Sequence, residues 1–269
     1  MSALLDVRNL TIKVGAKTLV NDVSFELAAG DSLGILGESG SGKSLTCKAI
    51  IGLLPKHFKV EGEVFFQGEN LLVMSRPVKT RLRGRRIGFI MQNPMGAFDP
   101  LETIGGQMVE TMQAHLDISA KEALEKAECV LGEVLIRNPG RVLRQYPHEL
   151  SGGMLQRVMI GLALSLEPDL LIGDEPTTAL DVITQYEVMS LFQKIRQSSR
   201  SALVLVSHDL GVIAKTAGRL LVMHQGRVLE IGPIEKVFRN PEKEQTRYLI
   251  DSRLVMMKKF HEQLRGWEQ

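Results

Sequence analysis

A glycine-rich segment of eight residues is the clearest chemical feature of the sequence. It consists of Gly37, Glu38, Ser39, Gly40, Ser41, Gly42, Lys43 and Ser44, and it fits the pattern G-x-x-x-x-G-K-[ST]. In such a loop, backbone amides and a helix N-terminus bind phosphate oxygens, the lysine reaches the β- and γ-phosphates, and the final hydroxyl ligates Mg²⁺. A glycine-rich turn without a ligand is the alternative. The segment follows a short apolar run and opens a helical one, which favours a nucleoside triphosphate site.

Two adjacent carboxylates end a second apolar run. Residues 170–173 read Leu-Leu-Ile-Gly, and Asp174 and Glu175 follow. Because neighbouring residues on a strand point to opposite faces, we expect the two acids to have different roles. Asp174 would hold Mg²⁺, through water, and Glu175 would orient and polarise the water that attacks the phosphate. A solvated strand end before Pro176 is the alternative, and the presence of the phosphate loop argues against it.

A second glycine pair lies in the run Leu-Ser-Gly-Gly-Met-Leu-Gln-Arg at residues 150–157. Ser151 can cap a helix that begins here, while Gly152 and Gly153 leave backbone amides open to a phosphate at the positive helix end. A capped helix alone would explain Ser151. The chain already has a complete phosphate loop, however, so a second anion site suggests that each nucleotide is bound between two chains.

The elements that must position these residues indicate an α/β fold with a mainly parallel sheet. We expect antiparallel strands first, over residues 4–10, 11–14 and 23–27. Short apolar strands, buried on both faces, are expected over residues 32–36, 88–91, 170–173, 202–206 and 220–223. From about residue 94 to residue 166 helical spacing replaces the strand pattern, which predicts an inserted helical subdomain. The charged tail after about residue 233 is expected to form a peripheral helix or two, with Leu249, Leu254, Met257 and Leu264 available for packing.

Composition narrows the classes of partner. The 33 Lys and Arg residues nearly balance the 31 Asp and Glu residues, so no general field for nucleic acid exists. The basic segment Arg76–Arg86 lacks interleaved aromatics and reads as a solvated surface turn. The two cysteines, Cys47 and Cys129, suggest reduced residues in a cytosolic protein, and no His/Cys cluster points to a metal site. No apolar run approaches a membrane span or a secretion signal, so we expect a chain that is neither secreted nor membrane-spanning.

Residues 150–157 resemble the signature motif of ABC-transporter ATPases, and the resemblance covers about residues 4–235. It implies an ATP-hydrolysing P-loop NTPase (RecA-like) domain over residues 1–235, with an N-terminal antiparallel β subdomain, the helical subdomain at about 94–166, and a C-terminal extension over 236–269. The cofactors implied are ATP and Mg²⁺. Val14 stands near the position where the family usually has an aromatic that stacks on adenine, which leaves the stacking partner open.

The resemblance also assigns roles to single residues. Gln92 would sense Mg²⁺ and the membrane partner, Asp181 in the run 178–181 would communicate across the dimer, and His208 would contact the γ-phosphate. The residues that would bind the ATP of a partner subunit are Ser151, Gly152, Gly153 and Gln156. Mg²⁺ would be held by Ser44, Gln92 and Asp174, and the catalytic residues would be Glu175, His208 and Gln92.

Residues 37–48, 91–101, 146–157 and 240–249 resemble the dipeptide, oligopeptide and nickel importers, and within that group a nickel importer's ATP-binding subunit. No cysteine follows Cys129, whereas many peptide-importing members have a cysteine cluster in the tail. The resemblance implies uptake of nickel, free or chelated, by a complex at the cytoplasmic face of the cell membrane, where this chain would be peripheral. That complex would contain two membrane-spanning permease subunits, a second and commonly non-identical ATPase subunit, and an extracytoplasmic solute-binding protein, without nucleic acid.

Four alternatives remain. The same role in a dipeptide or oligopeptide importer differs only in cargo. A soluble ABC protein of translation or DNA repair fits less well, because the chain has one set of motifs and no sustained heptads. A non-hydrolysing regulatory module is weakened by the presence of Glu175, Gln92 and His208. A small-molecule P-loop kinase leaves residues 150–157 unexplained.

Overall fold

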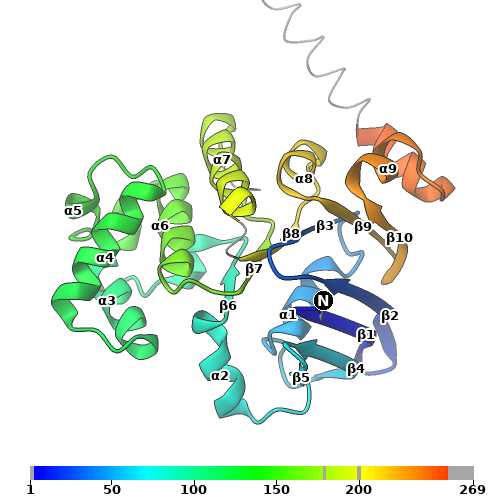
Figure 1. Ribbon diagram of the computed structural model, residues 1–269, viewed down its shortest axis with the longest axis horizontal. Coiled ribbons are helices and arrows are strands. Elements are labelled where there is room, and N and C mark those ends of the chain that lie inside the picture. The colour runs from blue at the N-terminus through cyan, green and yellow to red at the C-terminus, as the bar shows by residue number, and fades with distance from the viewer. Residues whose placement is uncertain (1–2, 178–179, 199–200, 254–269) are drawn as a thin grey trace, which may run out of the picture.

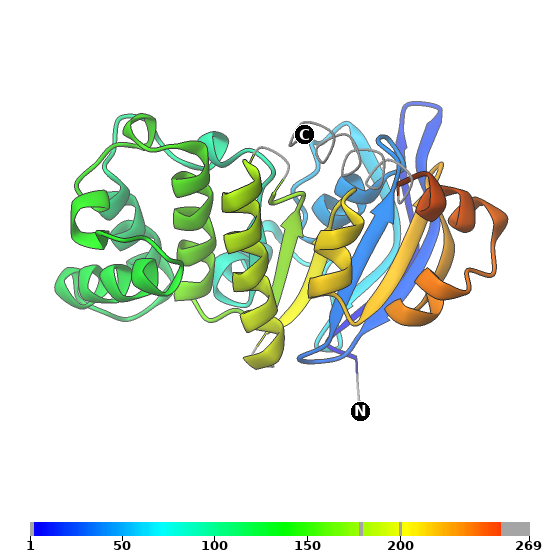
Figure 2. The ribbon, with the colours of Figure 1, turned by 90° about the horizontal axis from the view of Figure 1, so that it is seen from above.

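The computed structural model describes residues 3–177, 180–198 and 201–253. Two sheets lie side by side, with helices on both faces of the larger one and a group of helices at its far end (Figure 1). Seen from above, α6, α7 and α8 stand next to one another along one face of this sheet (Figure 2). The α/β class predicted from the sequence is confirmed.

The smaller sheet is antiparallel and has the strand order β2-β1-β4-β5. Its strands are β1 (Leu5–Val14), β2 (Lys17–Leu27), β4 (Phe58–Phe66) and β5 (Glu69–Asn70). The prediction of two strands over residues 4–14 was wrong, because β1 is continuous. Its pairing with β2 and β4 shifts register between Val7 and Ile12, and Asn9 there has a φ of 50°. This bulge bends one continuous strand and interrupts its alternation of side chains.

The larger sheet is parallel except at one edge and has the order β10-β9-β3-β8-β7-β6. Its strands are β3 (Ser32–Gly37), β6 (Ile87–Ile90), β7 (Leu170–Asp174), β8 (Ala202–Val206), β9 (Arg219–His224) and the antiparallel β10 (Arg227–Pro233). Every residue of β3, β7 and β8 is buried, as expected for strands covered on both faces. The carboxyl ends of the parallel strands meet at one edge, where α/β sheets bind ligands.

Helices account for the region between β6 and β7. They are η1 (Pro94–Ala97), α3 (Ile104–His115), α4 (Ala120–Glu133), α5 (Pro139–Val142), η2 (Pro147–Glu149) and α6 (Gly152–Ser165). The other helices are α1 (Lys43–Ile50), α2 (Arg76–Arg85), α7 (Val182–Ser198), α8 (Leu210–Thr216) and α9 (Ile234–Arg239), followed by a helix at 244–253. The prediction of a turn over the basic segment Arg76–Arg86 was wrong: its first part is helical, and the chain breaks the helix at Arg83 and Gly84.

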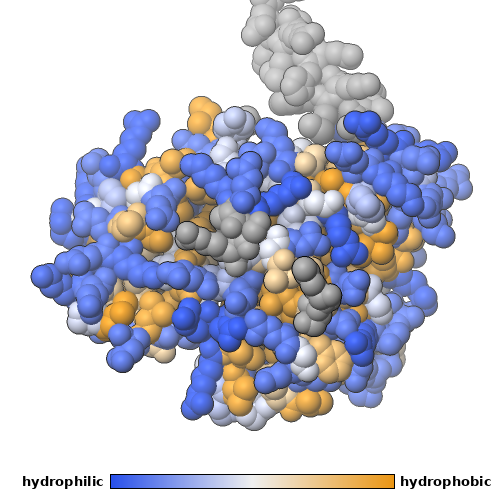
Figure 3. Space-filling view, in the orientation of Figure 1, coloured by the Kyte–Doolittle hydropathy of each residue, from blue (hydrophilic) through white to orange (hydrophobic). Residues whose placement is uncertain are grey.

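Three clusters of buried side chains hold the layers together. One joins the helices between β6 and β7 to the larger sheet around Phe192, and another joins α1 to both sheets. The third brings Leu249 and Ile250 of the tail against Leu36, next to the phosphate loop. Leu249 thus packs as expected, whereas Leu254, Met257 and Leu264 lie outside the described residues. Polar side chains cover most of the face seen in Figure 3, with apolar patches between them. Within residues 3–253, apart from the undescribed gaps, no helix is both long and apolar enough to cross a membrane.

Candidate functional site

The glycine-rich segment lies where β3 passes into α1. Gly42 precedes the helix with a φ of 100°, and Gly40 has a φ of 78°, a region that side chains strongly disfavour. A Cβ on Gly42 would also lie 2.9 Å from Val20 Cγ2 in β2. Glycine is therefore required at residue 42 both by conformation and by the close approach of the smaller sheet.

Lys43 is buried with 5% of its surface exposed, and its ammonium group bridges the loop. Nζ donates to the carbonyl oxygens of Gly37 at 3.0 Å and Glu38 at 2.8 Å. Burial lowers the pKa of Lys43, and the carboxylates of Glu175 and Asp174 oppose that shift. Because an ammonium group has three N–H donors, these two contacts leave a donor for an anion.

Ser41 is the second buried polar residue of the loop. Its Oγ has no hydrogen-bond partner, although only 3% of the residue is exposed. A buried hydroxyl without a partner is costly, and its place between the loop backbone and α1 fits a phosphate group that would supply the missing partner. The loop thus has a free ammonium donor and an unsatisfied hydroxyl, which a phosphate group could pair with.

Ser44 of α1 and Asp174 at the end of β7 are in direct contact. Ser44 Oγ donates to Asp174 Oδ1 at 2.6 Å, and Lys48 Nζ lies 3.9 Å from Asp174 Oδ2. Asp174 is 2% exposed, and burial raises its pKa while the Ser44 hydrogen bond opposes that shift. A hydroxyl beside a carboxylate is the oxygen donor set that Mg²⁺ accepts, so these two residues fit that ion. Lys48, which the sequence reading did not single out, is one helical turn beyond Ser44.

Glu175 brings Gln92 and His208 together. Its Oε2 lies 3.3 Å from Gln92 Nε2 and 3.3 Å from His208 Nδ1. Gln92 follows β6, Glu175 follows β7 and His208 follows β8, and these three strands are neighbours in the sheet. Glu175 has a φ of 49° and its amide donates to Val206 O, so the backbone turns sharply here. A carboxylate positioned between an amide and an imidazole, close to Asp174, can orient a water molecule and accept its proton.

Asp209 is a residue of this edge that the sequence reading missed. Its Oδ1 accepts hydrogen bonds from the amides of Gly211 and Val212, which caps α8, and its Oδ2 accepts from Gln185 Nε2 of α7 at 2.8 Å. Aspartate just before a helical run is a recognisable capping signal. The bond to Gln185 could not have been found from spacing. This bond attaches Asp209, which follows His208, to α7.

The N-terminus of α6 carries the second glycine pair. Ser151 caps the helix, since its Oγ accepts from the amide of Met154 at 3.2 Å. Ser151 and Gly152 are exposed, and nothing lies within 4 Å of a Cβ built on Gly152. A Cβ on Gly153 would lie 2.5 Å from Thr184 Cγ2 of α7. The helix end is thus open to solvent on one side and in close contact with α7 on the other.

Gln156 differs from the other three residues of this group. It is 1% exposed, and its Nε2 has no hydrogen-bond partner. It lies one turn inside α6, among the core residues of the helical subdomain.

Asp181 is exposed and caps α7. Its Oδ1 accepts from the amides of Ile183 and Thr184, and its Oδ2 accepts from Thr184 Oγ1 at 2.7 Å. The hydrogen bond from the Thr184 amide is the main cause of the lowered pKa of Asp181. Thr178 and Ala179 of the same run lie outside the described residues.

The described residues contain no group of three or more His, Cys, Asp or Glu side chains able to hold a metal ion. The donor set at Ser44 and Asp174 is of a different kind, because it needs oxygen atoms from phosphate and water to complete it.

Comparison with known families identifies this combination of phosphate loop, carboxylates and capped glycine helix. The family model described as "ABC transporter" matches residues 20–178. This chain belongs to the ABC transporter family. Its membership means that the chain binds ATP and implies that it hydrolyses it.

The most similar relatives found include ATP-binding proteins of importers. The metal-staphylopine import system ATP-binding protein CntD of Staphylococcus aureus is 45% identical over 98% of this chain and 98% of its own length. The oligopeptide transport ATP-binding protein OppD of Haemophilus influenzae is 40% identical over 94% of this chain and 79% of its own length. Among solved structures, a dimeric post-hydrolysis state of the ATP-binding cassette MJ0796 bound to ADP and Pi matches with a TM-score of 0.77 and 28% identity, over 86% of this chain and 98% of that one. This chain is an ATP-binding subunit of the importer group.

Proposed function

We propose that this chain powers the uptake of a metal chelate, with nickel as the first candidate metal. The observation that carries this proposal is the 45% identity along 98% of both chains with the metal-staphylopine import ATP-binding protein. Uptake of a dipeptide or oligopeptide is the second candidate. It is supported by 40% identity to an oligopeptide and a dipeptide transport ATP-binding protein.

In the proposed mechanism, the loop Gly37–Ser44 binds the phosphates of ATP through its amides and Lys43. The unpartnered hydroxyl of Ser41 gains a phosphate oxygen as its partner. Ser44 and Asp174, with Gln92, would hold Mg²⁺. When bound, that ion would neutralise charge on the β- and γ-phosphates.

Glu175 is the proposed general base of hydrolysis. Its carboxylate, held between Gln92 and His208 at 3.3 Å from each, orients water toward the γ-phosphate and accepts its proton. His208 donates to the γ-phosphate in the closed state. The 16% exposure of the Glu175 side chain supports this role, because limited solvent access keeps the carboxylate in one orientation.

A second ATPase subunit completes each site in this proposal. The N-terminal part of α6, with Ser151, Gly152, Gly153 and Gln156, binds the ATP held by the partner. Asp181 links the two nucleotide sites across the dimer. The assembly contains two permease subunits and a solute-binding protein, and the chain, with its ATPase unit over residues 1–235 and its extension over 236–269, lies at the cytoplasmic face of the membrane.

The catalytic assignment is tested by Glu175→Gln in the assembled complex. This change keeps the shape of the side chain and removes the base, so ATP binding is retained while turnover falls to background. Glu133→Gln, an exposed change on α4, is the matched control and keeps normal turnover. Near-normal hydrolysis by Glu175→Gln would remove this residue from its proposed role.

The cargo is tested by ATP hydrolysis in the purified complex with its solute-binding protein. Stimulation by Ni²⁺ together with a chelator supports the metal proposal, whereas stimulation by peptides alone assigns the chain to the peptide importers. Recovery of the chain from its native membrane without any permease subunit would favour a soluble ABC protein instead.

A further inference from the structure

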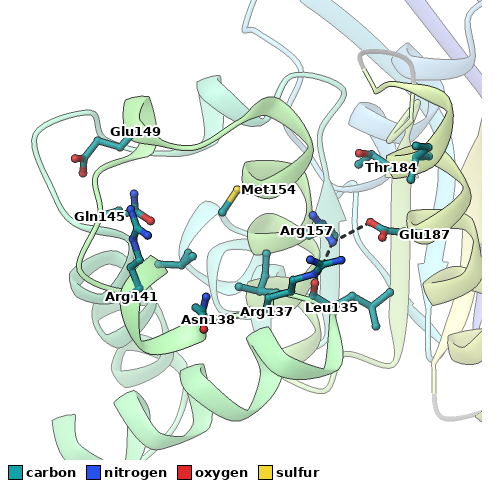
Figure 4. Close-up of a pocket in the computed structure, with 13 residues that line it drawn as sticks. Leu135, Arg137, Asn138, Arg141, Gln145, Glu149, Met154, Arg157, Thr184 and Glu187 are labelled. Carbon is teal, nitrogen blue, oxygen red and sulfur yellow. Dashed lines mark hydrogen bonds and ion pairs between the residues drawn. The ribbon is translucent and has the colours of Figure 1, made fainter.

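A cavity of about 560 Å³ lies outside the proposed nucleotide site. It is half open to solvent and is lined by the connector over residues 135–149, the first turns of α6 and the first turns of α7 (Figure 4). None of the residues assigned above to nucleotide or Mg²⁺ binding lines it. The volume falls within the range of specific binding sites, and the function proposed above does not account for it.

Arg157 fixes the inner wall of this cavity. Its Nη1 donates to Leu135 O at 3.0 Å and pairs with Glu187 at 2.9 Å, and its side chain is only 14% exposed. One guanidinium thus ties α6 to the connector and to α7. Because Glu187 already pairs with its charge, Arg157 supports the wall of the cavity and is not the group that we expect to bind a ligand.

Two further arginines supply charge that is not balanced. Arg137 and Arg141 line the cavity and are exposed, and neither has an ion pair or side-chain hydrogen bond among the described residues. The other acidic residue of the lining, Glu149, uses its Oε2 to accept from the amide of Tyr146 at 2.7 Å. With three arginines against two glutamates, the lining carries a net charge of +1.

Apolar side chains stand beside these charges. Leu135 is 39% exposed and Ile183 is 74% exposed. Leu135 also has a φ of 63°, which is rare for a side chain of this kind, and the Arg157 hydrogen bond to its carbonyl oxygen holds it there. Exposed aliphatic groups next to arginines are typical of protein interfaces.

We propose that this cavity receives an acidic segment of a partner protein, a loop or helix end with carboxylates next to an aliphatic side chain. The carboxylates pair with Arg137 and Arg141, whose planar guanidinium groups bind them in a bidentate manner. The aliphatic side chain covers Leu135 and Ile183. A protein segment fits better than a small anion, because the charges and the apolar atoms lie at the rim, where a broad surface is needed to exclude water.

The position of the cavity gives such binding a consequence. The connector leads directly into Ser151, and α7 begins next to Asp181. A segment seated between them holds the signature helix and α7 in one relative position. The partner would therefore change the rate of ATP turnover without touching the nucleotide.

The experiment places a photo-crosslinking amino acid at residue 138, where Asn138 lines the cavity, in the full-length chain within its native membrane complex. The crosslinked segment is identified by mass spectrometry. We expect a segment of another protein with Asp or Glu beside an aliphatic residue, and a loss of crosslinking of about tenfold in the R137E/R141E variant. Arg144→Glu is the control, since Arg144 is exposed on the same connector but does not line the cavity.

Two further measurements decide between outcomes. The double variant must keep its melting temperature and basal ATPase activity, and lysine in place of the partner's carboxylates must restore its crosslinking. Undiminished crosslinking in the double variant, a segment without carboxylates, a second copy of this chain, or no crosslinked protein at all would each overturn the proposal.

Discussion

The unpartnered hydroxyl of Ser41 allows ATP binding to be separated from folding, because Ser41→Ala should have opposite effects on the two. Without ATP, the hydroxyl is buried and makes no hydrogen bond. Its removal takes away the cost of an unsatisfied polar group, which is about 1 kcal/mol at the lower end of the usual range. For a chain of this size, the melting temperature is then expected to rise by about 2–4 °C.

With ATP and Mg²⁺ at saturation, the wild-type hydroxyl gains a phosphate partner that the variant lacks. We expect ATP affinity to fall by about fivefold, which corresponds to about 1 kcal/mol. Ser41→Ala is therefore more stable than the wild type without ATP, and this advantage disappears or reverses when ATP is added. Thermal unfolding of both proteins, measured with and without ATP, checks this expectation.

Ser39→Ala is the control for Ser41→Ala, because Ser39 lies in the same loop but is exposed. Its melting temperature without ATP should stay within about 1 °C of the wild type, as is usual for surface changes. The reasoning is refuted if Ser41→Ala lowers the melting temperature in the absence of ATP, or if it leaves the ATP-induced gain in stability unchanged.

Three other predictions concern packing and pH. Gly153→Ala should destabilise the chain by about 1–3 kcal/mol in urea unfolding, because the new Cβ would lie 2.5 Å from Thr184 Cγ2. Adding Thr184→Ser should recover part of this loss, and strictly additive effects of the two changes would contradict the contact. Phe192→Ala, at a fully buried position, should cost about 3–5 kcal/mol in the same assay, and a loss below about 1 kcal/mol would disprove its place in the core. Burial, with help from Arg85, lowers the pKa of His115 below its ordinary value of 6.5, so its contribution to stability is complete above pH 6.5 and is lost as the pH falls toward the folded pKa. His115→Gln should flatten the stability profile between pH 8 and pH 5.5, and an unchanged slope would exclude His115 as its source.

Some parts of the fold could be predicted because local sequence decides them. The five buried strands of the larger sheet were predicted to within about two residues. A short, continuous apolar run between turn residues is typical of a strand that is buried on both faces. The capping of α6 by Ser151 was predicted for the same reason, since the cap and its helix are adjacent in sequence.

Other parts of the fold could not be predicted from local sequence, because contacts between distant residues determine them. The strand β4 was missed, since its alternation is interrupted by Gly62, where a Cβ would lie 2.6 Å from Asn9 O of β1. Nothing near residue 62 in sequence reports that contact. Gln156 was assigned to the ATP of a partner subunit from its motif, and no local signal reports that the packing of α6 buries it in this chain.

The candidate site shows the same division. The motifs identify Gln92, Glu175 and His208 one by one. That Gln92 and His208 both lie next to the same carboxylate oxygen of Glu175 follows from the order of three parallel strands. Strand order is a property of the whole chain. It could be expected from the family resemblance and not from any single segment.

The contact between Ser44 and Asp174 joins residues 130 positions apart, and this separation bears on how the chain is made. The phosphate loop leaves the ribosome long before β7 exists, so a nascent chain has a glycine loop without its carboxylate. This contact cannot form before both segments have been synthesised, and closing so long a loop costs conformational entropy. Nucleotide binding at full strength therefore requires a completed sheet, and ATP in the cell would stabilise finished chains selectively over partly synthesised ones.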